Sequence, residues 1–253
     1  MIGGVPVVCG GIVRKPRDAA AWTETAISRS SMQQEQQFHL PREREIVNQV
    51  LTAYFTDLSP YRPIFNETDV HEKIDVLYSS ISSNADVRAG IASSRHHDVT
   101  DDSGFLCCVY RIFALGTLSV ENRRICQAER VEENWLSHEE FYDLALALKP
   151  DLQNSISTLQ ARLILHWYLF IKRHGKALWR LVGNMVHLAI ELGLHHNPRE
   201  QGDTFTPEEC QLRMRLWLIC LVHDRETSII FGQPLAVQRA DLNAPPPTHF
   251  PPS

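Results

Sequence analysis

Three polar side chains in the second half of the chain have the spacing of a metal site on a helix. His187, Glu191 and His195 recur at steps of four residues, so on one continuous helix they share roughly one face. Imidazole nitrogens and a carboxylate oxygen are ordinary zinc ligands. The alternative is a polar outer face with one histidine at the helix end, where the helix dipole favours it. We favour the polar face, because two histidines on one helix are a weak signal for a metal.

A second group of metal-ligating residue types comprises His96, His97 and Asp98, with Asp101 and Asp102 close behind. It lies in a stretch from 79 to 103 that is rich in serine, asparagine and aspartate, which predicts a long surface loop or a disordered insert. A zinc site needs ligands at fixed spacing on rigid elements. We therefore expect no metal site in this stretch.

Charged side chains further along could form an anion site instead. Arg213, Trp217 and Asp224 share one stripe of a predicted helix, and Arg215 lies beside them. In the functional interpretation, the arginines meet an anionic effector in a pocket between helices. In the structural interpretation, Arg213 or Arg215 pairs with Asp224 or with Glu191 and so holds two helices together. We favour the structural network, because ion pairs of this kind serve stability as often as function.

Catalytic motifs are missing from the sequence. It contains no nucleophile elbow, no phosphate-binding P-loop and no dinucleotide-binding glycine set. The six cysteines include no C-x2-C pair and suggest no disulfide framework. We predict that the chain is not an enzyme and holds no cofactor of its own. An α-helical enzyme that uses the His187 face is the weaker alternative.

Composition restricts the class of protein further. With 253 residues, 43% of them hydrophobic and 22% charged, the chain is typical of a soluble globular protein. A formal net charge of -5 argues against a general phosphate-binding surface, so any contact with DNA must come from elsewhere. No run of about 18 apolar residues is evident, which predicts no membrane span.

Two predicted helices would position the charged residues discussed above. An apolar stripe from Leu178 to Leu192 predicts the first, and Gly193 follows it where a left-handed C-cap belongs. For the second, Thr206, Pro207 and Glu209 form a capping box with proline at the first helical position. Gly232 and Pro234 are expected to end this second helix.

Further helices are predicted upstream, and no strand pattern is found. The first is opened by Pro41, and a short second one is capped by Thr68 or Asp69. A buried helix over 105–118, in which Gly116 lets a neighbour approach, is followed by a charged helix over 119–135. The capping box of Ser137 and Glu140 starts the next helix, and the last, over 157–172, is ended by Gly175. These patterns predict an all-α fold of stacked helical hairpins.

The chain divides into three predicted regions. Residues 1–38 lack an apolar period and are predicted to be a disordered tail or linker. Residues 39–243 hold the predicted α-helical domain. Residues 244–253 form a proline-rich tail, which is expected to be extended.

Four short motifs follow one another in this helical region. Residues 191–195 read ELGLH, 213–217 read RMRLW, 224–225 read DR and 232–234 read GQP. In this order and spacing they resemble the regulatory, or middle homology, domain of fungal zinc-cluster transcription factors. The resemblance covers roughly 45 to 247, with departures at His187, Met214, Leu218 and Gln233. The motif positions, which are structural or line an effector pocket, are Glu191, Gly193, His195, Arg213, Arg215, Trp217, Asp224, Arg225, Gly232 and Pro234.

The resemblance carries several expectations. It implies a nuclear protein that controls transcription by RNA polymerase II and binds DNA through a zinc cluster, which this chain lacks, so zinc is expected only in a missing N-terminal cluster. It also implies a homodimer or a heterodimer with related factors, and a small-molecule effector. The alternative is a stand-alone α-helical interaction module, a truncated relative that titrates partners. The family domain usually continues with more helices, so we expect a truncated C-terminus, uncovered apolar surface and self-association.

Overall fold

The computed structural model describes residues 40–41, 43–87, 103–127, 136–148, 154–201, 204–238 and 244–247. The chain divides into two units, Met1–Leu40 and Pro41–Ser253, and all the elements below belong to the second. The tail predicted over 1–38, the His96–Asp98 group and most of the proline-rich end lie outside the described residues. The three-region division therefore stays a prediction.

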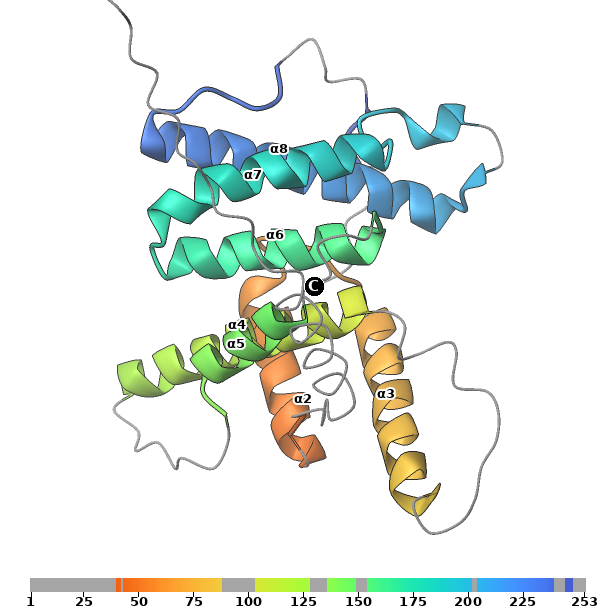
Figure 1. Cartoon of the computed structure of the whole chain (residues 1–253), viewed down its shortest axis with the longest axis vertical. Coiled ribbons are helices and arrows are strands. Elements are labelled where there is room, and N and C mark those ends of the chain that lie inside the picture. Colours follow the sequence, from red (N-terminus) through yellow and green to blue (C-terminus); the bar gives the residue numbers. More distant parts are fainter. Residues whose placement is uncertain are drawn as a thin grey trace, which may run out of the picture. The chain divides into compact units, whose positions relative to one another are not determined.

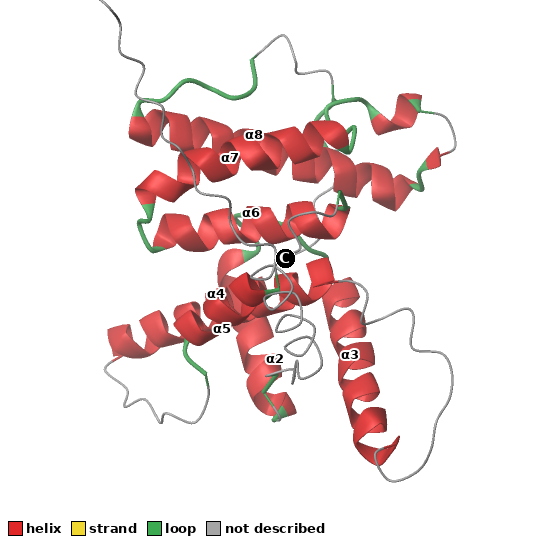
Figure 2. Ribbon diagram, in the orientation of Figure 1, coloured by secondary structure: helices red, strands yellow, loops and turns green. Residues whose placement is uncertain are grey.

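The fold of the described residues is all-α, as predicted, and no strand occurs among them (Figure 2). The helices are α2 (Arg44–Ala53), which continues into a π-helical turn η2 (Tyr54–Leu58), α3 (Glu67–Val87), α4 (Ser103–Gln127), α5 (His138–Ala147), α6 (Ile156–Ile171), α7 (Gly175–Glu191), a short 3-10 turn η4 (Pro198–Glu200) and α8 (Pro207–Phe231).

Two helical hairpins share their middle helix. Helices α6, α7 and α8 run side by side in alternating directions, and α6 also touches α8 (Figure 1). On the other side of α6 lies α4, which packs against α2 and α5 as well. The core therefore extends from α2 through α4 and α6 to α8, which confirms the stacked arrangement.

Helix α4 is one element where two were predicted. Leu118 and Val120 are both buried, and no residue that breaks a helix separates the apolar half from the charged half. The stretch Gly104–Arg124 of this helix is long and apolar enough to cross a membrane, with a mean hydropathy of 1.4. However, 83% of it is buried inside the domain. It is the central core helix of the described fold.

Three helix ends differ from their predicted positions. Helix α3 begins at Glu67, because Asn66 accepts the N–H of Thr68 (3.1 Å), and it continues to Val87 into the predicted loop. Helix α2 begins at Arg44, three residues after Pro41. Helix α6 ends at Ile171, and Arg173, two residues further on, takes φ 59, so the left-handed residue is not Gly175. Gly175 begins α7 instead.

The caps of the last two helices are confirmed. Gly193 has φ 72 and Gly232 has φ 61, the left-handed conformation that glycine adopts at low cost. Thr206 accepts the N–H of Glu209 (3.2 Å), and the Glu209 carboxylate accepts the N–H of Thr206 (2.8 Å). Both ends of α8 are therefore set by local sequence.

Candidate functional site

The three residues considered as a metal face, His187, Glu191 and His195, do not share one helix face. Helix α7 ends at Glu191, so His195 lies beyond it in the turn that Gly193 makes, four residues off the helix. There His195 packs towards Trp217, with ring centroids 6.2 Å apart, while His187 and Glu191 are exposed. The metal alternative requires the helix to continue through His195, whereas the favoured interpretation places one histidine at the helix end.

No other group of ligands replaces that face. Among the described residues, no three histidine, cysteine, aspartate or glutamate side chains come close enough to hold a metal ion. Cys107 and Cys108 are buried in α4, and Cys210 and Cys220 are buried in α8. The described side chains therefore do not fit a zinc cluster.

Asp224 holds the segment that follows α8 against that helix. Its side chain is 1% exposed, and its oxygens accept the N–H groups of Ala236 (2.9 Å) and Val237 (3.2 Å). Arg225 donates to the same carboxylate (2.8 Å) and to the carbonyl of Val237 (3.2 Å). The prediction that Arg213 or Arg215 pairs with Asp224 is therefore wrong: the neighbouring arginine and two backbone amides take that place.

The other motif residues near this end serve the same segment. Ser228 donates to the carbonyl of Pro234 (3.3 Å), and the N–H of Gln233 reaches the carbonyl of Ser228 (3.1 Å). Gly232 supplies the left-handed residue that lets the chain turn back. We call Asp224, Arg225, Ser228, Gly232 and Pro234 the α8 staple, and its hydrogen bonds give these residues a structural role.

Arg213 has a comparable role at the other end of the hairpin. It donates to the carbonyl of Leu192, and its guanidinium lies 4.1 Å from the ring centroid of Phe205. Burial lowers the pKa of Arg213, an effect that Cys210 and Glu209 oppose. Arg213 therefore caps the C-terminus of α7 rather than pairing with Glu191, because a helix end offers unpaired carbonyls at that point.

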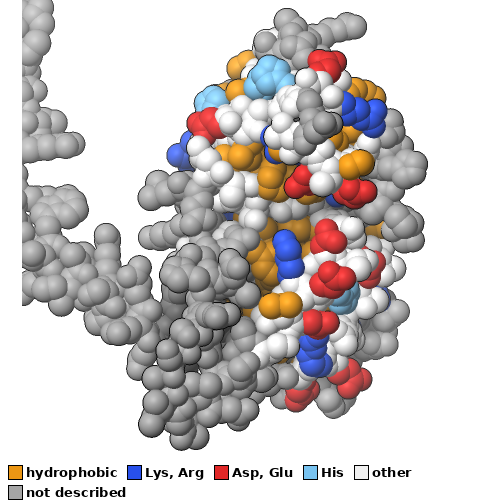
Figure 3. Space-filling model, turned by 90° about the vertical axis from the view of Figure 1, so that its right-hand side faces the viewer, with side chains coloured by type: hydrophobic (Ala, Val, Ile, Leu, Met, Phe, Trp, Pro, Cys, Tyr) orange, Lys and Arg blue, Asp and Glu red, His pale blue; other side chains and the backbone are white. Residues whose placement is uncertain are grey.

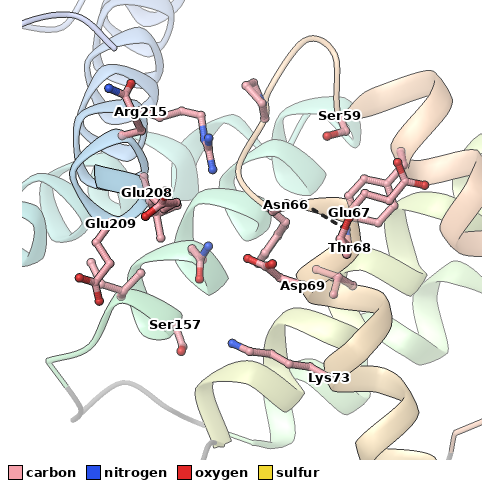
Figure 4. A pocket seen from close by; sticks show the side chains of 18 of the residues that line it. Ser59, Asn66, Glu67, Thr68, Asp69, Lys73, Ser157, Glu208, Glu209 and Arg215 are labelled. Atoms are coloured by element: carbon pink, nitrogen blue, oxygen red, sulfur yellow. Dashed lines mark hydrogen bonds between the residues drawn. The ribbon is translucent and has the colours of Figure 1, made fainter. Parts of the chain in front are cut away.

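Arg215 is a buried motif residue whose charge is not paired in the described part of the chain. It is 7% exposed, and its Nε is buried without a hydrogen-bond partner. Neither a hydrogen bond nor an ion pair of its guanidinium occurs within the described part of the chain. Burial lowers the pKa of Arg215, and the carboxylate of Asp69 on α3 acts against that shift. Figure 4 shows the side chain extending from α8 into an open space.

That space is a large cavity with a volume of about 1420 Å³. Its walls come from η2 and the turn after it and from the N-terminal parts of α3, α4, α6 and α8. Figure 3 shows apolar side chains in a hollow between acidic and basic ones on this face of the molecule. The residues that give it its character are Phe55, Phe65, Asp69, Lys73, Leu212 and Arg215.

Sequence reasoning identified Arg215 but missed the cavity. The sequence signal closest to the cavity is a set of three helix starts, because Asn66, Ser155 and Thr206 each cap the N-terminus of a helix that lines it. Nothing in the sequence states that these three N-termini meet, because they are separated by long stretches of chain.

A buried histidine pair lies between α6 and α8, apart from the cavity lining. The ring centroids of His166 and His223 are 4.1 Å apart, and Nε2 of His166 shares a hydrogen bond with the hydroxyl of Thr227 (2.9 Å). Both ring nitrogens of His223 are buried without a partner. Burial lowers the pKa of His166 to about 3, with a further contribution from Arg62, and lowers the pKa of His223 well below its usual value.

This pair is expected to make the fold sensitive to mild acid. Both histidines bind a proton more readily in the unfolded chain, so stability is complete above about pH 6.5 and falls as pH drops towards 3. Each histidine contributes a slope of up to about 1.4 kcal/mol per pH unit in that window. Urea unfolding between pH 8 and 4.5 measures this slope.

The matched variant is His223→Phe, which keeps an aromatic ring and removes both unpaired nitrogens. It is expected to flatten the decline below pH 6.5 while leaving the stability at pH 8 nearly unchanged. An unchanged slope in His223→Phe would show that other groups cause the acid sensitivity.

Comparison with known proteins places the chain among regulators of transcription. The family described as the fungal specific transcription factor domain matches residues 51–251. Similar proteins include an uncharacterized transcriptional regulatory protein of Schizosaccharomyces pombe, 31% identical over 152 residues, which are 59% of this chain and 19% of that protein. A probable transcription factor of Fusarium proliferatum is 26% identical over 208 residues, which are 81% of this chain and 28% of that protein.

A negative regulator of pleiotropic drug resistance from Candida glabrata is also similar, at 26% identity over 147 residues, 56% of this chain and 14% of that protein. The chain spans less than a third of the length of each of these relatives. No solved structure matches the chain.

Proposed function

Because this chain belongs to the family of the fungal specific transcription factor domain, we propose that it is the regulatory region of a transcription factor and changes its output when an effector binds. A role in the regulation of transcription follows from the family and from the similar regulators. The effector is the finer part of the proposal. It rests on one observation, the cavity into which the buried and unpaired Arg215 extends.

The cavity suits a regulatory role because several separate elements of the fold meet there. Its lining joins the N-termini of α6 and α8 to the first turn of α3. A ligand can shift a conformational equilibrium only by binding one arrangement better than another. A molecule that touches α3 and α8 at once would stabilise the arrangement that brings them together. This favours control by a bound small molecule over control by a change of charge alone.

Contact with DNA is assigned to another part of the protein. A net charge of -5 suits a domain that does not bind nucleic acid, and the described cysteines are dispersed. We propose that a zinc cluster outside this chain binds DNA, that the protein acts in the nucleus on RNA polymerase II genes, and that it works as a homodimer or a heterodimer. A catalytic role is not proposed.

A reporter assay tests the regulatory role. The chain is fused to a foreign DNA-binding module in a fungal cell, with the module alone as control. The fusion is expected to change expression from a promoter that carries the module's site, upwards or downwards. An output equal to that of the module alone, from a fusion shown to be folded and present in the nucleus, would refute the proposal.

A second candidate function is a stand-alone interaction module, and exposed apolar side chains at the end of α8 favour it. Ile229 is 80% exposed and Ile230 is 55% exposed, with Phe231 and Trp179 also partly exposed. Apolar surface of this kind marks a contact site or a tendency to associate. The predicted self-association remains a prediction, and these side chains are where it would occur.

A further inference from the structure

The Nε of Arg215 is buried without an acceptor, at the base of a guanidinium that extends into the cavity. It carries five N–H donors and remains charged at neutral pH, so its burial is costly unless an acceptor is supplied. Among the described residues no acceptor bonds to it, although only 7% of the surface of Arg215 is exposed. Asp69, whose carboxylate acts electrostatically on Arg215, is exposed and forms no ion pair with it in the described structure. A bound anion would supply the missing acceptor.

The helices around the cavity favour negative charge at the same point. Residues of the first turns of α3, α6 and α8 all line it: Thr68, Ser157 and Glu208. A helix N-terminus carries a partial positive charge from its unpaired N–H groups. Three such ends and a guanidinium therefore face one space (Figure 4).

The rim of the cavity limits how much negative charge a ligand can carry. The carboxylates of Glu67, Asp69 and Glu208 are exposed along the lining. Of the cations there, Lys73 is exposed, and its ammonium lies 5.1 Å from the ring centroid of Phe105. Polyanions such as nucleotides would be repelled by the carboxylates at this rim. A ligand with a single anionic group would meet less repulsion and could reach Arg215.

Apolar and aromatic side chains form another part of the lining, which also holds polar residues such as Asn66 and Gln160. Phe55 and Phe65 are buried core side chains whose faces reach the cavity, and Leu212 and Ile156 are partly buried beside them. Apolar walls with a few convergent polar groups are the usual composition of a small-molecule site. With about 1420 Å³, the cavity has room for the apolar body of a ligand of ordinary size.

We propose that this cavity binds a monocarboxylate with an apolar body, whose carboxylate pairs with the guanidinium of Arg215. The planar guanidinium and the planar carboxylate match in two parallel hydrogen bonds. The apolar body lies against Phe65 and Leu212, and the rim acids select against a second negative charge. The inference rests on the proposed regulatory function and names the chemical class of its effector.

Binding to the purified 253-residue chain tests the proposal with matched pairs of probes. Octanoate and phenylacetate are compared with octanamide and phenylacetamide, which have the same apolar body without the charge. Thermal shift and calorimetry are expected to show binding of at least one acid and of neither amide. If the amides bind as well as the acids, or if none of the four binds at millimolar concentration, the proposal is overturned.

Variants then locate the site. Arg215→Gln is expected to weaken acid binding about tenfold to a hundredfold, because two charge-assisted hydrogen bonds are lost. Arg215→Lys is expected to bind with intermediate affinity, because it keeps the charge and loses the planar pair. Arg180→Gln is the matched control, because Arg180 is an exposed cation on α7 outside the cavity lining, and it is expected to stay within about twofold of the parent.

Two further outcomes keep the proposal open to refutation. If Arg215→Gln does not fold, Arg215→Lys and Asp69→Asn decide: equal acid affinity in the parent and Arg215→Lys would overturn the anchoring role. A strong stability coupling between Arg215 and Asp69 in a double-mutant cycle, without acid binding, would assign Arg215 to an internal ion pair. Failure of the ligand class is separable from failure of the regulatory role, because the reporter assay needs no added acid and the binding assay needs no promoter.

Discussion

Replacing Asp224 with alanine is expected to lower the free energy of unfolding by about 3 to 5 kcal/mol, the cost of breaking a buried charged pair by removing one partner. The carboxylate is 1% exposed and accepts hydrogen bonds from Ala236 N–H, Val237 N–H and Arg225. Without it, the buried amide of Val237, the partly buried amide of Ala236 and part of a guanidinium lose their acceptor. Urea unfolding at pH 7 measures the change.

The control for Asp224→Ala is Asp143→Ala. Asp143 is exposed on α5, so its replacement is expected to change stability by no more than about 0.5 kcal/mol. Hydrogen exchange gives a local readout, because the amides of Ala236 and Val237 should lose protection before those of α6. Equal stability of the two variants, or unchanged protection at these amides, would contradict the staple.

Replacing Gly116 with alanine is expected to destabilise the domain by about 1 to 3 kcal/mol, although alanine is the better helix former. A Cβ atom there would lie 2.7 Å from Cγ1 of Val50 and closer still to the carbonyl oxygen of Val50. The oxygen belongs to the backbone of α2, so a rotamer change cannot relieve the contact. Helices α2 and α4 would have to separate.

Gly183→Ala is the matched control in α7. A Cβ atom at Gly183 meets nothing within 4 Å, so the substitution is expected to raise stability by about 0.5 to 1 kcal/mol through helix propensity alone. Thermal and urea unfolding of both variants test the pair. Loss of stability in Gly183→Ala, or a gain in Gly116→Ala, would show that backbone approach is not the deciding factor.

Local features of the fold were predictable because their causes lie within a few residues. The capping boxes at Ser137 and Thr206 and the left-handed glycines at 193 and 232 depend only on neighbouring residues, and all four are confirmed. Other helix ends were misplaced, because the local pattern alone did not determine them. Helix α6 is followed by its left-handed residue at Arg173 instead of Gly175, whereas α7 ends before His195, as Gly193 predicted.

The roles of the charged residues were decided by the tertiary structure. The sequence by itself determined the all-α class, the resemblance to a regulatory family and the list of motif residues. It did not determine that Asp224 binds the segment after its own helix, that Arg213 caps α7, or that Arg215 extends unpaired into a cavity. Arg213 and Arg215 are two residues apart on one helix and differ only in what other helices bring towards them. Side-chain pairing and cavities depend on surfaces that come from distant parts of the chain, and the periodicity of one helix carries no record of its neighbours.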